Sequence, residues 1–172
     1  MTLILETGSG NHNSNSYIDE TLVEEFATSS FKEKWEELST DNQVDLMIVA
    51  SLFINDSFEW AGKQKTLEQG LAFPRVGISY QGFDIPDDVV PRQVVRACVM
   101  ALGLLLEKGE SVFRSTGEAE VKKEKLAVME TEYFSRMIDE NATAFDDINN
   151  ILRGFYSQMQ KGGVISAQVL RA

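Results

Sequence analysis

The side chains that most often perform acid–base or nucleophilic chemistry are scarce in this sequence. The one histidine, His12, lies in the polar stretch GNHNSN, where we expect a solvated side chain rather than a catalytic one. The one cysteine, Cys98, stands inside the apolar stretch RACVMA and is expected to be a small core residue. Because covalent catalysis needs a nucleophile beside a positioned base, the sequence predicts that the protein is not an enzyme.

Carboxylates are numerous, but their positions favour a structural role. The pairs in DDVV (87–90) and FDDINN (145–150) precede predicted helices, where acidic side chains complement the helix N-terminus without a metal. No spacing of ligand residues matches a zinc site or a calcium loop. The glycine-rich stretch GSGN (8–11) is not a phosphate-binding loop, because no strand precedes it and no helix follows it. We therefore expect no metal and no cofactor.

The densest basic cluster is the natural candidate for binding nucleic acid. Lys122, Lys123 and Lys125 stand together, with Tyr133 and Phe134 downstream as stacking groups. The lysines alternate with glutamates, however, which is typical of a solvated surface. The chain carries 16 basic against 27 acidic residues, a net charge of −11, and this balance repels a nucleic-acid backbone unless the cations are segregated on one face.

The bulk composition predicts a single domain with a real core. The chain has 172 residues, of which 43% are hydrophobic and 25% charged, which is ordinary for a globular protein. A single cysteine allows no intramolecular disulfide and suggests a reduced, intracellular fold. The start, MTLILETGSG, lacks the basic leading segment of a signal peptide, and no stretch reaches the roughly 20 apolar residues of a membrane span. We expect no membrane association.

The pattern of apolar residues predicts mostly helices. Two short helices are expected around 22–26 and 31–35, and a long one from 44 to 58 with Ser39 or Thr40 as its N-cap. A second long helix is expected over 85–109, with Pro91 in its first turn and Gly109 as its stop signal. Its apolar residues cover most of its circumference, so it should be packed on more than one side.

Two further segments complete the expected organisation. The stretch 118–134 is ambiguous between strand and helix, and a last short helix is expected over 146–159. The predicted fold class is mainly α: a small helical bundle with two long central helices, plus an extended β-strand or hairpin arm and a C-terminal tail. The predicted divisions are a helical body with an extended N-terminal loop (1–113), an arm with a short helix (114–161) and a docking tail (162–172).

A rigid corner is predicted between the two long helices. Pro74 stands between Phe73 and Arg75, and proline fixes its own φ and pushes the preceding residue towards an extended conformation. Together with Trp60, these residues form the predicted structural corner, which covers one end of the helical body. Three roles stay open for Arg75: it anchors the corner, meets a neighbouring molecule, or is merely exposed.

The order of several motifs resembles a known family. The motifs are NSYIDETLVEEF, EWAGKQKT, GLAFPRVG and IPDDVVPRQVVRACVMALGLLL, and the likeness is most specific over 15–17, 60–62, 73–75 and 85–97. This order resembles the phage family labelled DnaT-like single-stranded-DNA-binding protein, whose members look like head–tail connector (adaptor) proteins of tailed phages. The family tends to have an extended segment where this chain reads EKLAVMETEY, although KLAV has Ala127 in place of the usual glycine.

The resemblance implies a virion structural protein that joins the portal to the tail as a ring-shaped adaptor in the neck, after synthesis in the host cytoplasm. Its implied partners are the portal protein, tail or nozzle proteins and further copies of itself in a ring, usually a dodecamer. Genomic DNA would pass through the channel without sequence-specific binding. The alternative is a replication-type single-stranded-DNA-binding protein, as the label says. The acidic balance favours the connector, since a binder needs a cationic groove.

The C-terminal tail is the predicted partner-binding segment. Its two glycines supply a hinge, and its few large apolar residues cannot bury enough surface to fold alone. We expect it to become ordered on the portal or on a neighbouring subunit, the alternative being an ordinary frayed terminus. The residues assigned to this contact are Gly162, Gly163, Val164, Ile165, Val169, Leu170 and Arg171.

Overall fold

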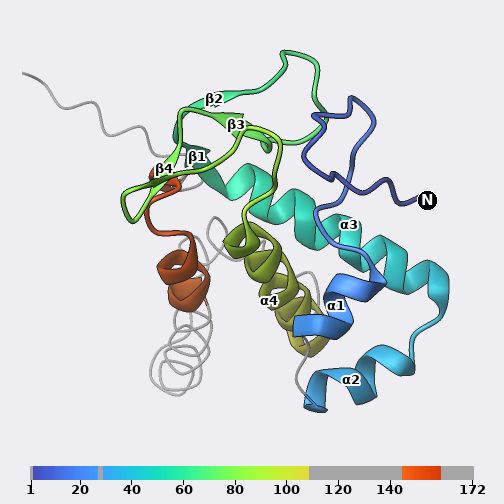
Figure 1. The fold of residues 1–172 in the computed structure, drawn as a ribbon. Coiled ribbons are helices and arrows are strands. Elements are labelled where there is room, and N and C mark those ends of the chain that lie inside the picture. Colours follow the sequence, from blue (N-terminus) through green and yellow to red (C-terminus); the bar gives the residue numbers. More distant parts are fainter. Residues whose placement is uncertain (1, 27–28, 109–144, 160–172) are drawn as a thin grey trace, which may run out of the picture.

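A computed structural model describes residues 2–26, 29–108 and 145–159 of the chain (Figure 1). The helices are α1 (Glu20–Phe26), α2 (Ser29–Glu36), α3 (Thr40–Ser57) and α4 (Arg92–Lys108). Residues 145–152 are helical as well. The strands are β1 (Phe58–Trp60), β2 (Lys63–Gln64), β3 (Arg75–Val76), β4 (Ser79–Tyr80), β5 (Phe83–Asp84) and β6 (Tyr156–Met159).

The strands form three separate antiparallel pairs instead of one sheet. β2 pairs with β3, β4 pairs with β5, and β1 pairs with β6. In the β1–β6 pair Trp60 lies opposite Tyr156, with an irregularity in the register between Glu59 and Trp60. This pair ties the end of α3 to the last described segment of the chain.

Helix α3 begins and ends where local chemistry dictates. Ser39 has an extended backbone, and its Oγ accepts a hydrogen bond from the amide of Asn42 at 3.4 Å, which confirms the predicted cap. Asp41 in the first turn complements the positive end of the helix. At Phe58 the backbone becomes extended, with φ −128° and ψ 141°, and the chain continues directly into β1.

Helix α4 lies in the middle of the packing. It contacts α3, α1 and α2. Its fully buried residues include Val94, Ala97, Cys98, Ala101 and Leu102. Small side chains alternate with larger ones along this surface, so neighbouring helices approach closely from more than one side.

The predicted fold class, a mainly α bundle with two long central helices, a β-strand or hairpin arm and a tail, is wrong. The described chain is a small mixed α/β domain, because residues 58–90 form five short strands instead of a simple connection. Gly62, Gly77 and Gly82 adopt positive φ values and turn the chain between these strands.

Two helix boundaries also differ from the sequence prediction. The helix expected over 85–109 begins only at Arg92, because prolines at 86 and 91 disfavour helical backbone in the residues before them. The helix expected over 146–159 ends at Leu152, Gly154 has a φ of +107°, and Tyr156–Met159 form β6 instead. The ambiguous stretch 118–134 lies outside the described residues.

Phe73 is the centre of an aromatic cluster in the core. Its ring is 0% exposed. It lies edge-on to Trp60 with ring centroids 4.9 Å apart, and to Tyr17 and Phe155 at 6.4 Å each. One side chain thus contacts the N-terminal segment, β1 and the segment that precedes β6.

We expect Phe73→Ala to lower the free energy of unfolding by about 3 to 5 kcal/mol, because a fully buried ring is removed and its cavity cannot close. Chemical denaturation measures the effect. The matched control is Phe83→Ala, since this ring is 76% exposed and its loss should change stability by less than about 0.5 kcal/mol. Equal stability of wild type and Phe73→Ala would show that the aromatic cluster does not hold the fold.

Candidate nucleic-acid interface

The structure brings the four predicted corner residues together. Trp60 packs on Phe73, and its indole Nε1 donates a hydrogen bond to the carbonyl of Asn55 at 2.9 Å. Pro74 is fully buried, and the Phe73–Pro74 peptide bond is cis. Arg75 follows in β3, at the edge of this cluster. The corner is therefore an interior joint between α3, β1 and β3.

The guanidinium of Arg75 donates hydrogen bonds to four backbone carbonyl groups. Its Nε donates to Ala61 at 2.7 Å, Nη1 to Ala72 at 3.1 Å, and Nη2 to Trp60 at 3.2 Å and Gly62 at 3.0 Å. Burial lowers the pKa of this guanidinium from its usual value. Arg75 thus fastens β1 and the β1–β2 turn to the corner, and it is not a free cation for an anionic ligand.

The other predicted binding residues cannot be placed. The tail residues Gly162, Gly163, Val164, Ile165, Val169, Leu170 and Arg171 lie outside the described residues. The same holds for the basic and aromatic cluster of Lys122, Lys123, Lys125, Tyr133 and Phe134.

The glycine-rich N-terminal loop is organised around a carboxylate of the protein itself. Glu6 Oε1 accepts hydrogen bonds from the amides of Gly8 at 2.8 Å and Gly10 at 3.0 Å, and Oε2 accepts from the amide of Asn11 at 2.9 Å and from Ser14 Oγ at 2.8 Å. Amides that converge in this way can bind an anion, but here the position is filled by Glu6. The loop is therefore no phosphate site.

Burial and hydrogen bonding act on the pKa of Glu6 in opposite directions. Burial acts to raise it, but the hydrogen bonds from Ser14, Gly10, Gly8 and Asn11 outweigh burial and hold the pKa below the usual 4.5. The carboxylate is thus charged and satisfied in the folded state. It joins the two ends of the loop and gives the N-terminal segment a fixed shape.

The two residues considered for acid–base or thiol chemistry are placed as follows. Nδ1 of the exposed His12 lies 2.7 Å from the carbonyl oxygen of Glu68. Cys98 is fully buried, and burial raises the pKa of its thiol.

Within the described ranges no group of three or more His, Cys, Asp or Glu residues could hold a metal ion. None of the described helices combines the length and hydropathy that a membrane span needs.

The β4–β5 hairpin displays the most exposed aromatic ring among the described residues. Gln81 and Gly82 connect the strands with φ values of 51° and 83°, as in the tight two-residue turns of hairpins. Tyr80 and Phe83 are directly opposite each other in the register, so their side chains project to the same face. Tyr80 stacks on Phe155 with centroids 4.6 Å apart, whereas Phe83 projects into solvent.

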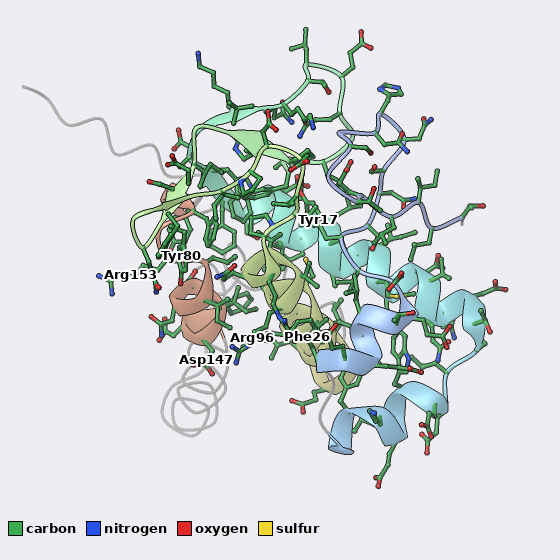
Figure 2. All side chains as sticks on the ribbon, in the orientation of Figure 1. Tyr17, Phe26, Tyr80, Arg96, Asp147 and Arg153 are labelled. Atoms are coloured by element: carbon green, nitrogen blue, oxygen red, sulfur yellow. The ribbon has the colours of Figure 1, made fainter. Side chains whose placement is uncertain are left out.

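An arginine lies beside this hairpin. Gly154 packs against the Tyr80 ring, at a distance where a Cβ would come 3.5 Å from Tyr80 Cδ2, and the preceding Arg153 is exposed. Figure 2 shows Tyr80 and Arg153 next to each other at one edge of the molecule. No hydrogen bond or ion pair joins the Arg153 guanidinium to another described residue. We call Tyr80, Phe83 and Arg153 the hairpin surface.

Several other described cations are already engaged. Arg92 forms an ion pair with Glu25 at 2.6 Å and lies 5.0 Å from the centre of the Phe26 ring. Lys65 Nζ donates to the carbonyl of Gly8 at 3.4 Å. Proteins that bind single-stranded nucleic acid commonly use aromatic rings that stack on bases and arginines that pair with phosphate, and the hairpin surface offers both kinds of side chain.

Sequence reasoning missed the hairpin surface. The signal was present in the stretch SYQGFD, where a Gln-Gly pair separates two aromatic residues. Arg153 could not be found in this way, because the sequence pattern predicts it inside a helix and its neighbour in the chain, Gly154, packs on Tyr80 only in the folded structure.

A protein-family model with the description "Putative DnaT-like ssDNA binding protein" matches residues 1–172. The chain therefore belongs to this family. None of the curated proteins and none of the solved structures matches it. The identification as a virion head–tail connector is wrong, because the matching family is described by DNA binding and not by a place in the virion. The portal and tail partners expected with it have no support.

We expect Glu6→Gln to lower the free energy of unfolding at pH 7 by about 1 to 3 kcal/mol, because an amide nitrogen cannot accept the hydrogen bonds that one carboxylate oxygen receives. Since the folded pKa of Glu6 is depressed, its contribution is present above the unfolded pKa and is lost as the pH falls through the folded pKa. The difference between wild type and variant should therefore shrink below about pH 4.5. Denaturant titrations from pH 7 to pH 3 measure it.

The exposed Glu37 supplies the control for this experiment. Glu37→Gln removes the same charge without touching the loop and should leave stability within about 0.5 kcal/mol. A Glu6→Gln protein as stable as Glu37→Gln at pH 7 would contradict the proposed role of the carboxylate.

Proposed function

We propose that this member of the DnaT-like family is a replication-type single-stranded-DNA-binding protein and that DNA contacts the hairpin surface. The observation that carries the proposal is the family match over residues 1–172. The geometry of Tyr80, Phe83 and Arg153 supports it, because these residues offer a stacking group and a cation on one edge.

The two aromatic rings have different parts in this proposal. Phe83 is the ring on which a base stacks, since it is 76% exposed. Tyr80 is held in place by its stack on Phe155 and forms the fixed side of the surface. Stacking of one base on an aromatic ring contributes about 1 to 3 kcal/mol and tolerates every base. Recognition of single strands without sequence preference follows.

Arg153 supplies the phosphate contact. It lies next to Tyr80, and its guanidinium can pair with a phosphate oxygen of a strand stacked on the hairpin. With only one or two such contacts, the logarithm of affinity should fall with the logarithm of salt with a slope of about −0.7 to −1.4. The acidic remainder of the protein opposes further contacts.

We expect weak binding of a fluorescent oligothymidine, with a dissociation constant above the micromolar range at about 0.15 M salt. Phe83→Ala should weaken the affinity about 5- to 150-fold, the equivalent of one lost base stack. Fluorescence anisotropy at two or more salt concentrations measures both. The control is Leu67→Ala, which removes an apolar side chain that is 94% exposed in a different loop.

The possible results separate the function from its location. Binding that survives both Phe83→Ala and Arg153→Ala would keep the function and reject the hairpin surface. Absence of binding by the wild type even at about 0.02 M salt, where the Debye length exceeds 20 Å, would reject the function itself.

A further inference from the structure

A hollow lies between α4 and the helix over residues 145–152, which are neighbours in Figure 1. Its volume is about 190 Å³. Most of its lining comes from α4, so part of this helix is open to solvent although the helix lies in the middle of the packing. The residues that line the hollow are Met100, Gly103, Leu104, Glu107 and Asp147.

One stripe of α4 carries opposite charges at its two ends. Arg96, Met100, Gly103 and Glu107 follow one another at intervals of four, three and four residues, which places them on one face of the helix. Arg96 and Glu107 are exposed, and neither has an ion-pair partner among the described residues. We call these four residues the α4 stripe.

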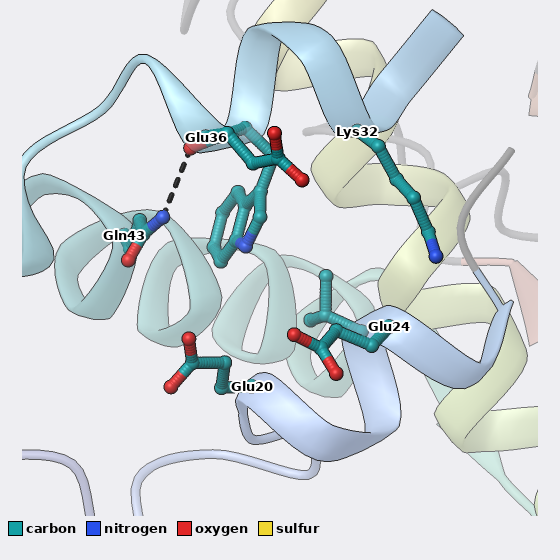
Figure 3. A pocket seen from close by; sticks show the side chains of 7 residues that line it. Glu20, Glu24, Lys32, Glu36 and Gln43 are labelled. Carbon is teal, nitrogen blue, oxygen red and sulfur yellow. Dashed lines mark hydrogen bonds between the residues drawn. The ribbon is translucent and has the colours of Figure 1, made fainter. Parts of the chain in front are cut away.

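The border of the stripe on the side of α2 is fixed. A Cβ at Gly103 would come 3.7 Å from Phe31 Cδ2, so α2 lies beside the stripe at this point. Phe31 stacks on Trp35 with ring centroids 5.7 Å apart, and Gln43 Nε2 donates to the carbonyl of Trp35 at 2.9 Å (Figure 3). The stripe is therefore formed before a partner arrives, which reduces the ordering that binding requires.

Two α4 stripes complement each other when they run antiparallel. In the register that sets Arg96 of one copy against Glu107 of the other, Met100 of each copy lies opposite Gly103 of the other. The ion pair then forms twice, and each methionine meets a position that has no side chain. A parallel pair in register would instead place like charges together.

We infer that this face binds a second copy of the chain through a two-fold contact between the α4 stripes. Met100 of each copy would enter the hollow of the other, where about 190 Å³ is available, and Arg96 would lie near Glu107 and Asp147 of the other copy. A two-fold contact uses the same surface on both copies, so assembly stops at a dimer and gives no ring.

The dimer should be weak. Its contact is essentially one helix face, and interfaces that bury less than about 1,200 Å² in total are typical of transient association. Two copies with a net charge of −11 also repel each other, but at about 0.15 M salt this repulsion is screened beyond about 8 Å, whereas the paired side chains of the stripe are in contact. The inference does not depend on DNA binding.

Sedimentation equilibrium of the full chain tests the inference, at about 0.15 M salt and at protein concentrations up to about 1 mM. The wild type should show a monomer–dimer equilibrium. Arg96→Glu and Glu107→Arg, each alone, should weaken the dimer about ten- to one hundredfold, because both ion pairs of the dimer become contacts between like charges.

Mixing the two variants makes the test specific for the antiparallel register. In a mixed dimer the acidic replacement at position 96 faces the basic replacement at position 107, and the unchanged Glu107 of one copy faces the unchanged Arg96 of the other. Both ion pairs return, so a one-to-one mixture should dimerise about as the wild type does. Lys63→Glu and Glu37→Arg reverse the same charges at exposed positions outside the stripe and should each associate like the wild type.

Three results would overturn the inference. They are a wild type that stays monomeric up to about 1 mM, a mixture that is no more dimeric than the two variants alone, and equal weakening by the control variants. If Arg96→Glu weakens binding of oligothymidine and leaves sedimentation unchanged, the stripe binds DNA and the inference is wrong.

Discussion

The hydroxyl of Tyr17 forms the junction on which the described fold depends. It donates to Asn55 Oδ1 at 2.7 Å and accepts the amide of Phe73 at 3.1 Å, while the same Asn55 oxygen accepts the amide of Ala72 at 2.7 Å. The side chain is 1% exposed, and burial raises the pKa of its hydroxyl, so it stays a neutral donor. One buried network thus joins the N-terminal segment, α3 and the corner.

The position of the hairpin surface follows from this junction through aromatic contacts. The backbone amide of Phe73 donates a hydrogen bond to the Tyr17 hydroxyl, and this bond places the Phe73 ring. The ring packs on Phe155, which in turn stacks on Tyr80. Tyr80 stacks on Phe155, whereas Phe83, the residue opposite it in the hairpin, is 76% exposed. The junction therefore holds one ring of the hairpin against the core and leaves the other in solvent.

The sequence could predict what depends on local pattern. The Ser39 cap and the burial of Cys98 follow from neighbouring residues, and both are found in the structure. Strands of two residues, such as β2 and β4, are too short to show an apolar alternation, so the mixed α/β class was not visible. β6 also escaped prediction, because its pairing with β1 depends on residues distant in the sequence.

The hairpin surface could not be predicted from the sequence either, because it too depends on residues that are distant in the sequence. Tyr80 and Phe83 are both aromatic residues of one hairpin, and the local sequence does not show that Tyr80 packs on the distant Phe155 while Phe83 stays exposed. The family was visible from the order of the motifs. The net charge describes the whole molecule, whereas the proposed DNA contact involves one edge of it.

Screening limits how far the acidic side chains would oppose the proposed DNA contact. At physiological salt, interactions between exposed charges are screened beyond about 8 Å. The exposed carboxylates of α1 and α2 lie on the other side of the molecule from β4, so their repulsion hardly reaches a strand on the hairpin surface, whereas the exposed Asp84 directly follows Phe83 and would act there. They still lower the rate of encounter at low salt, where screening is weak. Lowering the salt thus strengthens the Arg153 contact and the repulsion together, so the net salt dependence should be shallower than that of a basic binder.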